Sequence, residues 1–297
     1  MVQRTRADRL SRVAVVGTGA IGGAVAAALL SGGRRVTVWN RSPGRAAALV
    51  DRGAVHAADV TAAAATSSLV LVCLTDYPAA EQALAPLRHL DPAAPTSVVM
   101  LTTGTVREAE QMHGLVSGWG LDYLDAGVQT APEDIGTDRA TFIYSGSLEA
   151  FDAHRPSLEL LGPALWLGTD PGAAARWDLA LFGLWYDAYL GLLRAFEPLS
   201  QDRPALEGFA VAAQRQLQHA VDAVGETAAQ VASGVHPRGP ASLGEHLRVM
   251  RDLREARARS RLGEGGLDSP TRVVEELCRR GHGALGLTAV LDHALWQ

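Results

Sequence analysis

The stretch RWDLALFGLWYDAY, residues 176–189, has the apolar content of a helix but also carries two acids and two tyrosines. A carboxylate can pair with a positively charged substrate group, and a phenol can donate a hydrogen bond. On a helix, Asp178 and Tyr186 are about 80° apart in angle and about 12 Å apart along the axis, so both can border one cleft. Asp187 is about 180° from Asp178 and is expected to face water. Tyr189, about 20° from Asp178, is a second candidate for the phenol role.

These polar residues also have a simpler interpretation, in which each points at solvent from an otherwise packed helix. Choosing between the two requires the elements that would hold a reaction site. One feature of the composition already limits the chemistry. The chain contains no lysine, so all 27 of its basic residues are arginine. No mechanism in this protein can therefore use a lysine as acid, base or Schiff-base nucleophile.

The overall composition is that of a soluble globular protein. The chain has 297 residues, of which 47% are hydrophobic and 20% charged, and its net charge is -5. This charge offers no general attraction for nucleic acid or an anionic membrane. Cys73 and Cys278 fit no disulfide or metal pattern, and the nine scattered histidines give no reason to assign a metal. With no signal-type or membrane-spanning apolar run, we expect a cytoplasmic protein.

Short β-branched runs alternate with helical segments through the first part of the chain. The runs at 12–17, 34–42, 67–74, 96–102 and 121–127 are examples. This alternation predicts an α/β class fold, a Rossmann doubly wound parallel sheet, over residues 1–168. Helical periodicity then dominates, which predicts an all-helical domain over 169–297. A long inter-domain helix, about 171–197, joins the two domains.

A dinucleotide-binding fingerprint follows the first predicted strand. Gly17, Gly19 and Gly22 form G-x-G-x-x-G at the start of a helix, where glycines allow a tight turn and close approach of a pyrophosphate. The second predicted strand ends in Asn40-Arg41-Ser42 and lacks the acid that an NAD site usually presents there. Because Arg41 can bind a 2′-phosphate, the sequence predicts NADPH as the cofactor.

Other cofactor contacts are expected in the fingerprint loop, one turn beyond Arg41, and after the strands at 67–74 and 96–102, since ligands bind at the carboxyl edge of such sheets. The additional candidates are Thr18, Ala20, Ile21, Arg45, Leu74, Thr75, Asp76, Thr102, Thr103 and Gly104.

Several longer segments narrow the family. VVMLTTGT (98–105), YLDAGVQTAPEDIGTDRATFIYSGS (123–147), RWDLALFGLWYDAY (176–189) and the late GHG (281–283) resemble the imine reductase and reductive aminase family. The resemblance implies NADPH-dependent reduction of a C=N bond, with a cyclic or preformed imine, or a ketone plus an amine, as substrate. It also implies a homodimer in which the helical domain of one chain closes over the cofactor domain of the other. In reductive aminases the corresponding helix carries an aspartate and a tyrosine at the same spacing, which gives Asp178 and Tyr186 the catalytic roles.

Two departures and two alternatives stand beside this interpretation. Met100 occupies a position where relatives often carry asparagine, and Gln129 makes its loop unusually polar; with Tyr189, both are candidates for the substrate pocket. One alternative is an NADPH-dependent carbonyl reductase of the β-hydroxyacid type. That class uses a lysine on the inter-domain helix, and Arg176 is a poor proton donor near neutral pH. The other alternative is a non-catalytic NADPH-binding dimer.

Overall fold

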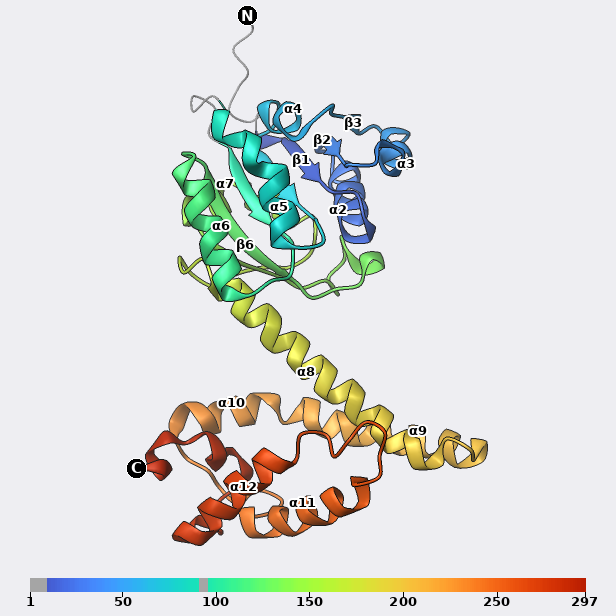
Figure 1. Ribbon diagram of the computed structural model, residues 1–297, viewed down its shortest axis with the longest axis vertical. Coiled ribbons are helices and arrows are strands. Elements are labelled where there is room, and N and C mark those ends of the chain that lie inside the picture. The colour runs from blue at the N-terminus through green and yellow to red at the C-terminus, as the bar shows by residue number, and fades with distance from the viewer. Residues whose placement is uncertain (1–9, 91–95) are drawn as a thin grey trace, which may run out of the picture. The chain divides into compact units, whose positions relative to one another are not determined.

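The computed structural model describes residues 10–90 and 96–297. The chain divides into two compact units between Gly183 and Leu184, a point inside the long helix α8, Ala173–Phe196 (Figure 1). The first unit carries the sheet, and the second is built from helices. Among the described residues, no helix is long and apolar enough to cross a membrane.

The first unit is built on an eight-stranded sheet with the order β3-β2-β1-β4-β5-β6-β7-β8. Strands β1 to β6 are parallel, and the order reverses between β1 and β4, as in Rossmann folds. The strand bounds are β1 Arg12–Val16, β2 Arg35–Trp39, β3 Val55–His56, β4 Leu69–Val72, β5 Ser97–Met100, β6 Asp122–Val128, β7 Phe142–Gly146 and β8 Ala164–Trp166.

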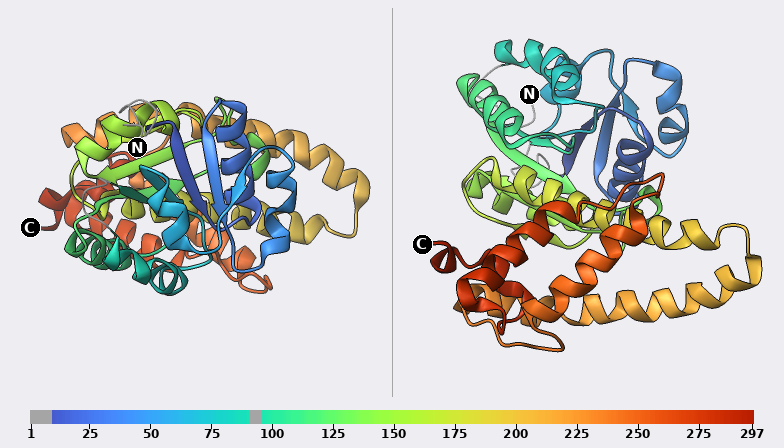
Figure 2. Two further views of the ribbon diagram at one scale, coloured as in Figure 1. Left: turned by 90° about the horizontal axis from the view of Figure 1, so that it is seen from above. Right: turned by 60° about the horizontal axis from the view of Figure 1, so that its bottom comes forward.

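Helices cover both faces of this sheet, so its strands read as continuous apolar runs (Figure 2). One face packs against α2 (Ala20–Ser31), α3 (Ala47–Val50) and α7 (Leu148–Leu158). The other face packs against α4 (Val60–Ala65), α5 (Tyr77–Leu84), α6 (Val106–Gly118) and Ala175 in the first turn of α8. The predicted fold class is thereby confirmed.

Two details of the sheet differ from the sequence prediction. Strand β7 runs antiparallel to β6, because the connection between them contains a short 3₁₀ turn but no crossover α-helix. Strand β8 then pairs parallel to β7. Strand β3 was not predicted, since its two residues are both exposed and give no apolar run.

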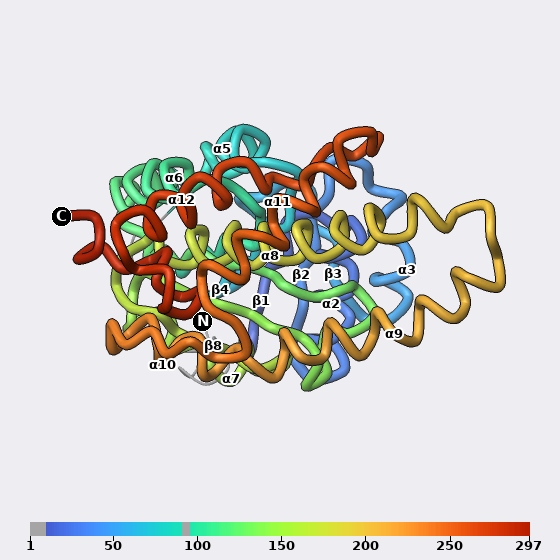
Figure 3. The backbone as a smooth tube through the Cα atoms, turned by 90° about the horizontal axis from the view of Figure 1, so that it is seen from below, coloured from blue at the N-terminus to red at the C-terminus, as the bar shows by residue number. Residues whose placement is uncertain are grey.

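In the second unit, the end of α8 is followed by four helices: α9 (Arg203–Asp222), α10 (Val224–Ser233), α11 (Leu243–Arg257) and α12 (Asp268–Leu277). Helix α9 returns beside the end of α8 and continues almost directly into α10 (Figure 3). The rings of Phe196 and Phe209 meet edge to face in this hairpin, with centroids 5.7 Å apart. A small core joins α11, α12 and the C-terminal segment; its buried members are Leu243, Leu247, Val274, Leu277 and Ala289.

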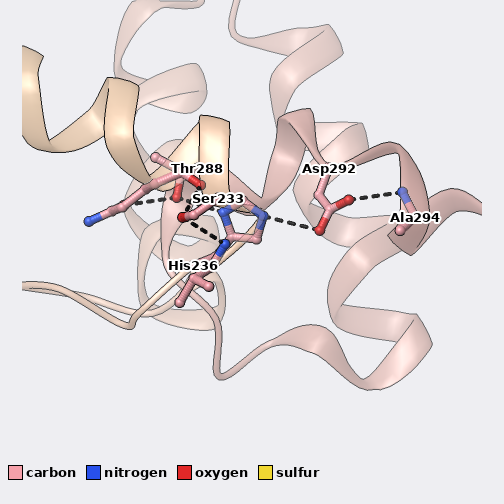
Figure 4. A network of polar contacts seen from close by, with 7 residues as sticks. Ser233, His236, Thr288, Asp292 and Ala294 are labelled. Carbon is pink, nitrogen blue, oxygen red and sulfur yellow. Dashed lines mark hydrogen bonds and ion pairs between the residues drawn. The ribbon is translucent and has the colours of Figure 1, made fainter.

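A polar network holds the C-terminal segment in place (Figure 4). The side chain of His236 is buried; its Nδ1 lies 3.0 Å from Thr288 Oγ1, and its Nε2 lies 3.1 Å from Asp292 Oδ2. Thr288 Oγ1 in turn donates to Gln230 Oε1 of α10 at 3.0 Å. The imidazole therefore links α10 to the last residues of the chain.

Candidate active site

The fingerprint loop has the shape that a dinucleotide needs. Gly17 has φ +95°, and a Cβ there would lie 2.2 Å from the carbonyl oxygen of Cys73. A Cβ on Gly22 would lie 2.0 Å from the carbonyl oxygen of Gly17, so neither position tolerates a side chain. Gly19 faces open space and no side chain caps α2, which leaves the helix N-terminus free for a phosphate. Thr18 Oγ1 is buried and has no hydrogen-bond partner among the described residues. The loop therefore fits a pyrophosphate.

At the end of β2, Asn40 holds two loops together, and the arginines Arg41 and Arg45 are exposed. Thr18 N–H donates to Asn40 Oδ1 at 3.1 Å, and Asn40 Nδ2 donates to the carbonyl of Ser42 at 3.0 Å. The Asn40 amide thus joins the fingerprint loop to the turn after β2. Arg41 and Arg45 are exposed beside it, as binding of a 2′-phosphate requires.

Two of the predicted contact residues after β4 and β5 use their side chains to shape the loops. Thr102 Oγ1 donates to the carbonyl of Leu74 at 3.2 Å and lies 3.3 Å from the Leu74 nitrogen. Asp76 caps α5 by accepting the Ala79 N–H at 2.8 Å. Thr75 and Thr103 remain exposed at this edge. Gly104 leaves room for a neighbouring ring, because a Cβ there would lie 2.4 Å from Tyr77 Cε2.

Asp178 is almost completely enclosed in the first unit, with 2% of its surface exposed. Gln129 Nε2 donates to Asp178 Oδ1 at 2.7 Å and to its backbone carbonyl at 3.2 Å. The Thr103 hydroxyl and the backbone N–H of Val128 also hydrogen-bond the carboxylate. Burial raises the pKa of Asp178, while these three donors act in the opposite direction. The side chain rests on Gly127, where a Cβ would lie 2.8 Å from Oδ1.

A second buried acid, Asp125, lies on the same strand face as Gly127. Tyr77 donates to Asp125 Oδ1 at 2.5 Å, and Tyr123 donates to the same oxygen at 3.2 Å. The backbone N–H of Ala175 also donates to this carboxyl. Sequence reasoning missed Asp125; the available signal was an acid alternating with Tyr123 in the buried strand of LDYLDAG.

Among the predicted pocket residues, Gln129 contacts Asp178. The Met100 side chain is fully buried in the core that faces α5 and α6, and its role in a substrate pocket stays a prediction. Tyr186 and Tyr189 belong to the second unit, where both are exposed, and Tyr189 stacks on Trp185 with centroids 5.2 Å apart. Asp187 is exposed, as expected for a solvated acid.

Comparison with known proteins identifies the family to which the chain belongs. Residues 12–168 match the model described as the NAD binding domain of 6-phosphogluconate dehydrogenase. Residues 170–294 match the model of the NADPH-dependent reductive aminase-like C-terminal domain. The chain belongs to the reductive aminase and imine reductase family.

Three relatives illustrate this membership. An NADPH-dependent reductive aminase from Aspergillus oryzae is 28% identical over 285 residues, which are 95% of this chain and 96% of the relative. A reductive aminase from Aspergillus terreus, solved with NADPH and ethyl-5-oxohexanoate, is 31% identical, with 95% and 99% of the two chains covered and a TM-score of 0.83. An imine reductase from Myxococcus stipitatus, solved with NADP+, is 27% identical, with 94% and 98% covered and a TM-score of 0.85.

Family membership confirms two of the sequence predictions. The protein is an NADPH-dependent oxidoreductase of a family that acts on C=N bonds, and NADPH is its cofactor. The fingerprint loop, the cations after β2 and the loops after β4 and β5 stay the predicted contacts of this cofactor.

Proposed function

We propose that the protein reduces the C=N bond of a cyclic or preformed imine, or of an imine formed from a ketone and an amine, to give an amine. The observation that carries this proposal is the buried carboxylate of Asp178, held beside the Thr103 loop at the carboxyl edge of the sheet. Support for the ketone-plus-amine route comes from a reductive aminase of Aspergillus terreus solved with NADPH4, cyclohexanone and allyl amine.

NADPH, when bound, supplies the hydride that reduces the carbon of the C=N bond. Asp178 pairs with the positive charge of the protonated nitrogen and thereby stabilises the iminium form that accepts hydride. Gln129, Thr103 and Val128 keep the carboxylate oriented, since each donates a hydrogen bond to it. Tyr186 positions the substrate nitrogen through its phenol.

We also propose that the protein acts as a homodimer in the cytoplasm, with the cofactor domain ending at residue 168 and the helical domain of one chain, 169–297, completing the site of the other. Support for the dimer comes from α9 and α10, neither of which buries a residue within the chain. Their exposed apolar side chains are Val211, Leu217, Val221, Val224 and Val231. Sedimentation velocity tests the dimer. The Val221→Asp variant should contain more monomer than the unaltered protein. An unaltered protein that sediments as a monomer would refute the proposed dimer.

The test of function measures NADPH oxidation with a panel of cyclic imines beside the corresponding ketones. Asp178→Asn should lower the imine rate by about 100-fold or more, since it removes the charge that pairs with the iminium. Asp187→Asn is the matched control, because Asp187 is an acid of the same helix but is exposed. Reduction of ketones alone would support the carbonyl reductase instead. Tight NADPH binding without turnover on any substrate would support the non-catalytic dimer.

A further inference from the structure

Asp125 is a second enclosed acid near the proposed reaction site. Like Asp178 it is 2% exposed, and one oxygen, Oδ1, accepts hydrogen bonds from both Tyr77 at 2.5 Å and Tyr123 at 3.2 Å. Two phenols from different parts of the sequence thus share one buried carboxyl oxygen. The proposed function of Asp178 gives Asp125 no task, although the two acids lie on the same side of the sheet.

Helix α8 connects Asp125 to Asp178. The backbone N–H of Ala175 donates to the Asp125 carboxyl, and Asp178 lies three residues further along, about one turn of the helix. Asp125 and Gly127 point to the same face of β6, and Asp178 lies directly over Gly127. The two carboxyl groups therefore lie over the same face of one strand, and the charge on Asp178 acts on Asp125.

We propose that Asp125 is a positioning residue for imine reduction: its carboxyl group anchors the first turn of α8 and, by gaining or losing a proton, sets the charge beside Asp178. This inference rests on the proposed function. Asp125 makes and breaks no bond in the substrate. When ionised, it adds a second negative charge near the nitrogen that carries the positive charge, and when protonated it leaves Asp178 to act alone.

The surroundings of Asp125 allow both protonation states near neutral pH. Burial raises the pKa of Asp125 to about 7, opposed by the hydrogen bonds from the two tyrosines and reinforced by the charge of Asp178. Two further groups face the tyrosines from α6. Glu108 acts on Tyr77, and the ring of His113 meets that of Tyr123 edge to face at 5.8 Å.

The first experiment is the pH profile of kcat/KM with a permanently charged N-methyl cyclic iminium, which has no ionisation of its own on the nitrogen. The unaltered enzyme should show an inflection near pH 7. Asp125→Asn should abolish that inflection. Tyr77→Phe should move the inflection upward by about one pH unit. The hydrogen bond from Tyr77 lowers the pKa of Asp125, so its removal raises that pKa. A merely structural role predicts lower rates in both variants with no change in the shape of the profile.

The matched control is Asp122→Asn, an exposed acid on the opposite face of the same strand, which should leave the profile unchanged. A second measurement needs neither turnover nor a folded Asp125 variant. Infrared difference spectra of the unaltered protein with NADPH bound, recorded across the pH range, should show a buried carboxyl group that ionises near pH 7. The same band should titrate at higher pH in Tyr77→Phe.

The outcomes separate this inference from the proposed function. A carboxyl band that titrates as expected in a protein that reduces no imine would overturn the proposed function and, with it, the role of Asp125 in that reaction. Imine reduction with no such band, or with the same inflection in Asp125→Asn, would overturn the inference alone.

Discussion

Because Asp178 packs directly against Gly127, adding one methyl group at position 127 should strongly reduce the rate of imine reduction. In Gly127→Ala, the new Cβ would lie 2.8 Å from Asp178 Oδ1 and 2.9 Å from its Cβ. Ordinary van der Waals contact begins at 3.4 Å, so the carboxylate must retreat by about 0.6 Å. Gly127 does not have a positive φ, so the backbone itself accepts alanine without strain. The whole effect of the substitution therefore falls on Asp178 and its donors.

Two opposing contributions set the size of this effect. Alanine in a strand is favoured over glycine by about 0.5–1 kcal/mol. Loss of the hydrogen bond from Gln129 to the carboxylate costs about 1.5–3 kcal/mol, which gives a net destabilisation of about 1–2 kcal/mol. Catalysis is more sensitive, because a misplacement of about 1 Å can cost about 100-fold in rate. We expect kcat/KM for an imine to fall by about 10- to 100-fold in Gly127→Ala.

The assay compares imine-dependent NADPH oxidation, NADPH affinity and thermal unfolding in the same preparations. NADPH affinity should be unchanged. Gly114→Ala is the control, since Gly114 lies in α6, where an added Cβ would meet nothing within 4 Å, and this variant should gain stability without losing activity. Full activity in Gly127→Ala, with Asp178 still required, would show that Asp178 does not need the position described here.

Three further predictions test other parts of the chain. Arg41→Ser should raise the dissociation constant for NADPH by about 10- to 100-fold and leave that for NADH nearly unchanged, as measured by fluorescence titration; equal loss for both cofactors would refute a 2′-phosphate contact. Burial raises the pKa of Asp125 from 3.8 to about 7, so its contribution to stability is present at low pH and is lost as pH rises through about 7. Between pH 3.8 and about 7, the melting temperature should therefore fall less in Asp125→Asn than in the unaltered protein. His236→Ala should lower the melting temperature of the helical unit by removing the bonds to Thr288 and Asp292, whereas His246→Ala, at a half-buried position on α11, should have little effect.

Local patterns were sufficient to predict the strand, turn and helix of the fingerprint loop. A strand, a glycine turn and a helix lie within a short stretch of sequence, and the steric demands on Gly17 and Gly22 come from neighbouring backbone. The direction of β7 was not predictable in the same way. It depends on a connection that has no periodic pattern, and alternation of strands with helices elsewhere suggested a parallel strand.

The acid half of the site depends on contacts between distant parts of the sequence. The Tyr77 hydroxyl that holds Asp125 comes from 48 residues earlier, and Gln129 reaches Asp178 across 49 residues. Position 178 could be selected by helical spacing and family resemblance, but the hydrogen bonds that Gln129, Thr103 and Val128 donate to its carboxyl group could not be predicted. Met100 was selected by resemblance to relatives, and the structure shows its side chain buried in the core, which local sequence could not reveal.

Small residues explain why an acid can be buried at the start of α8. The helix opens with Ala173, Ala174 and Ala175, all buried, and it faces Gly127 on β6. Because these residues have only methyl groups or hydrogens as side chains, helix and strand approach closely enough to enclose Asp178. Enclosure alone would keep the carboxyl protonated, and exposure alone would leave its charge screened by water. Three donors offset part of the effect of burial on Asp178, and the charge of its ionised form would act strongly on a cation in this low-dielectric environment. Substitutions that loosen the helix start should therefore weaken the same interaction as substitutions of the acid itself.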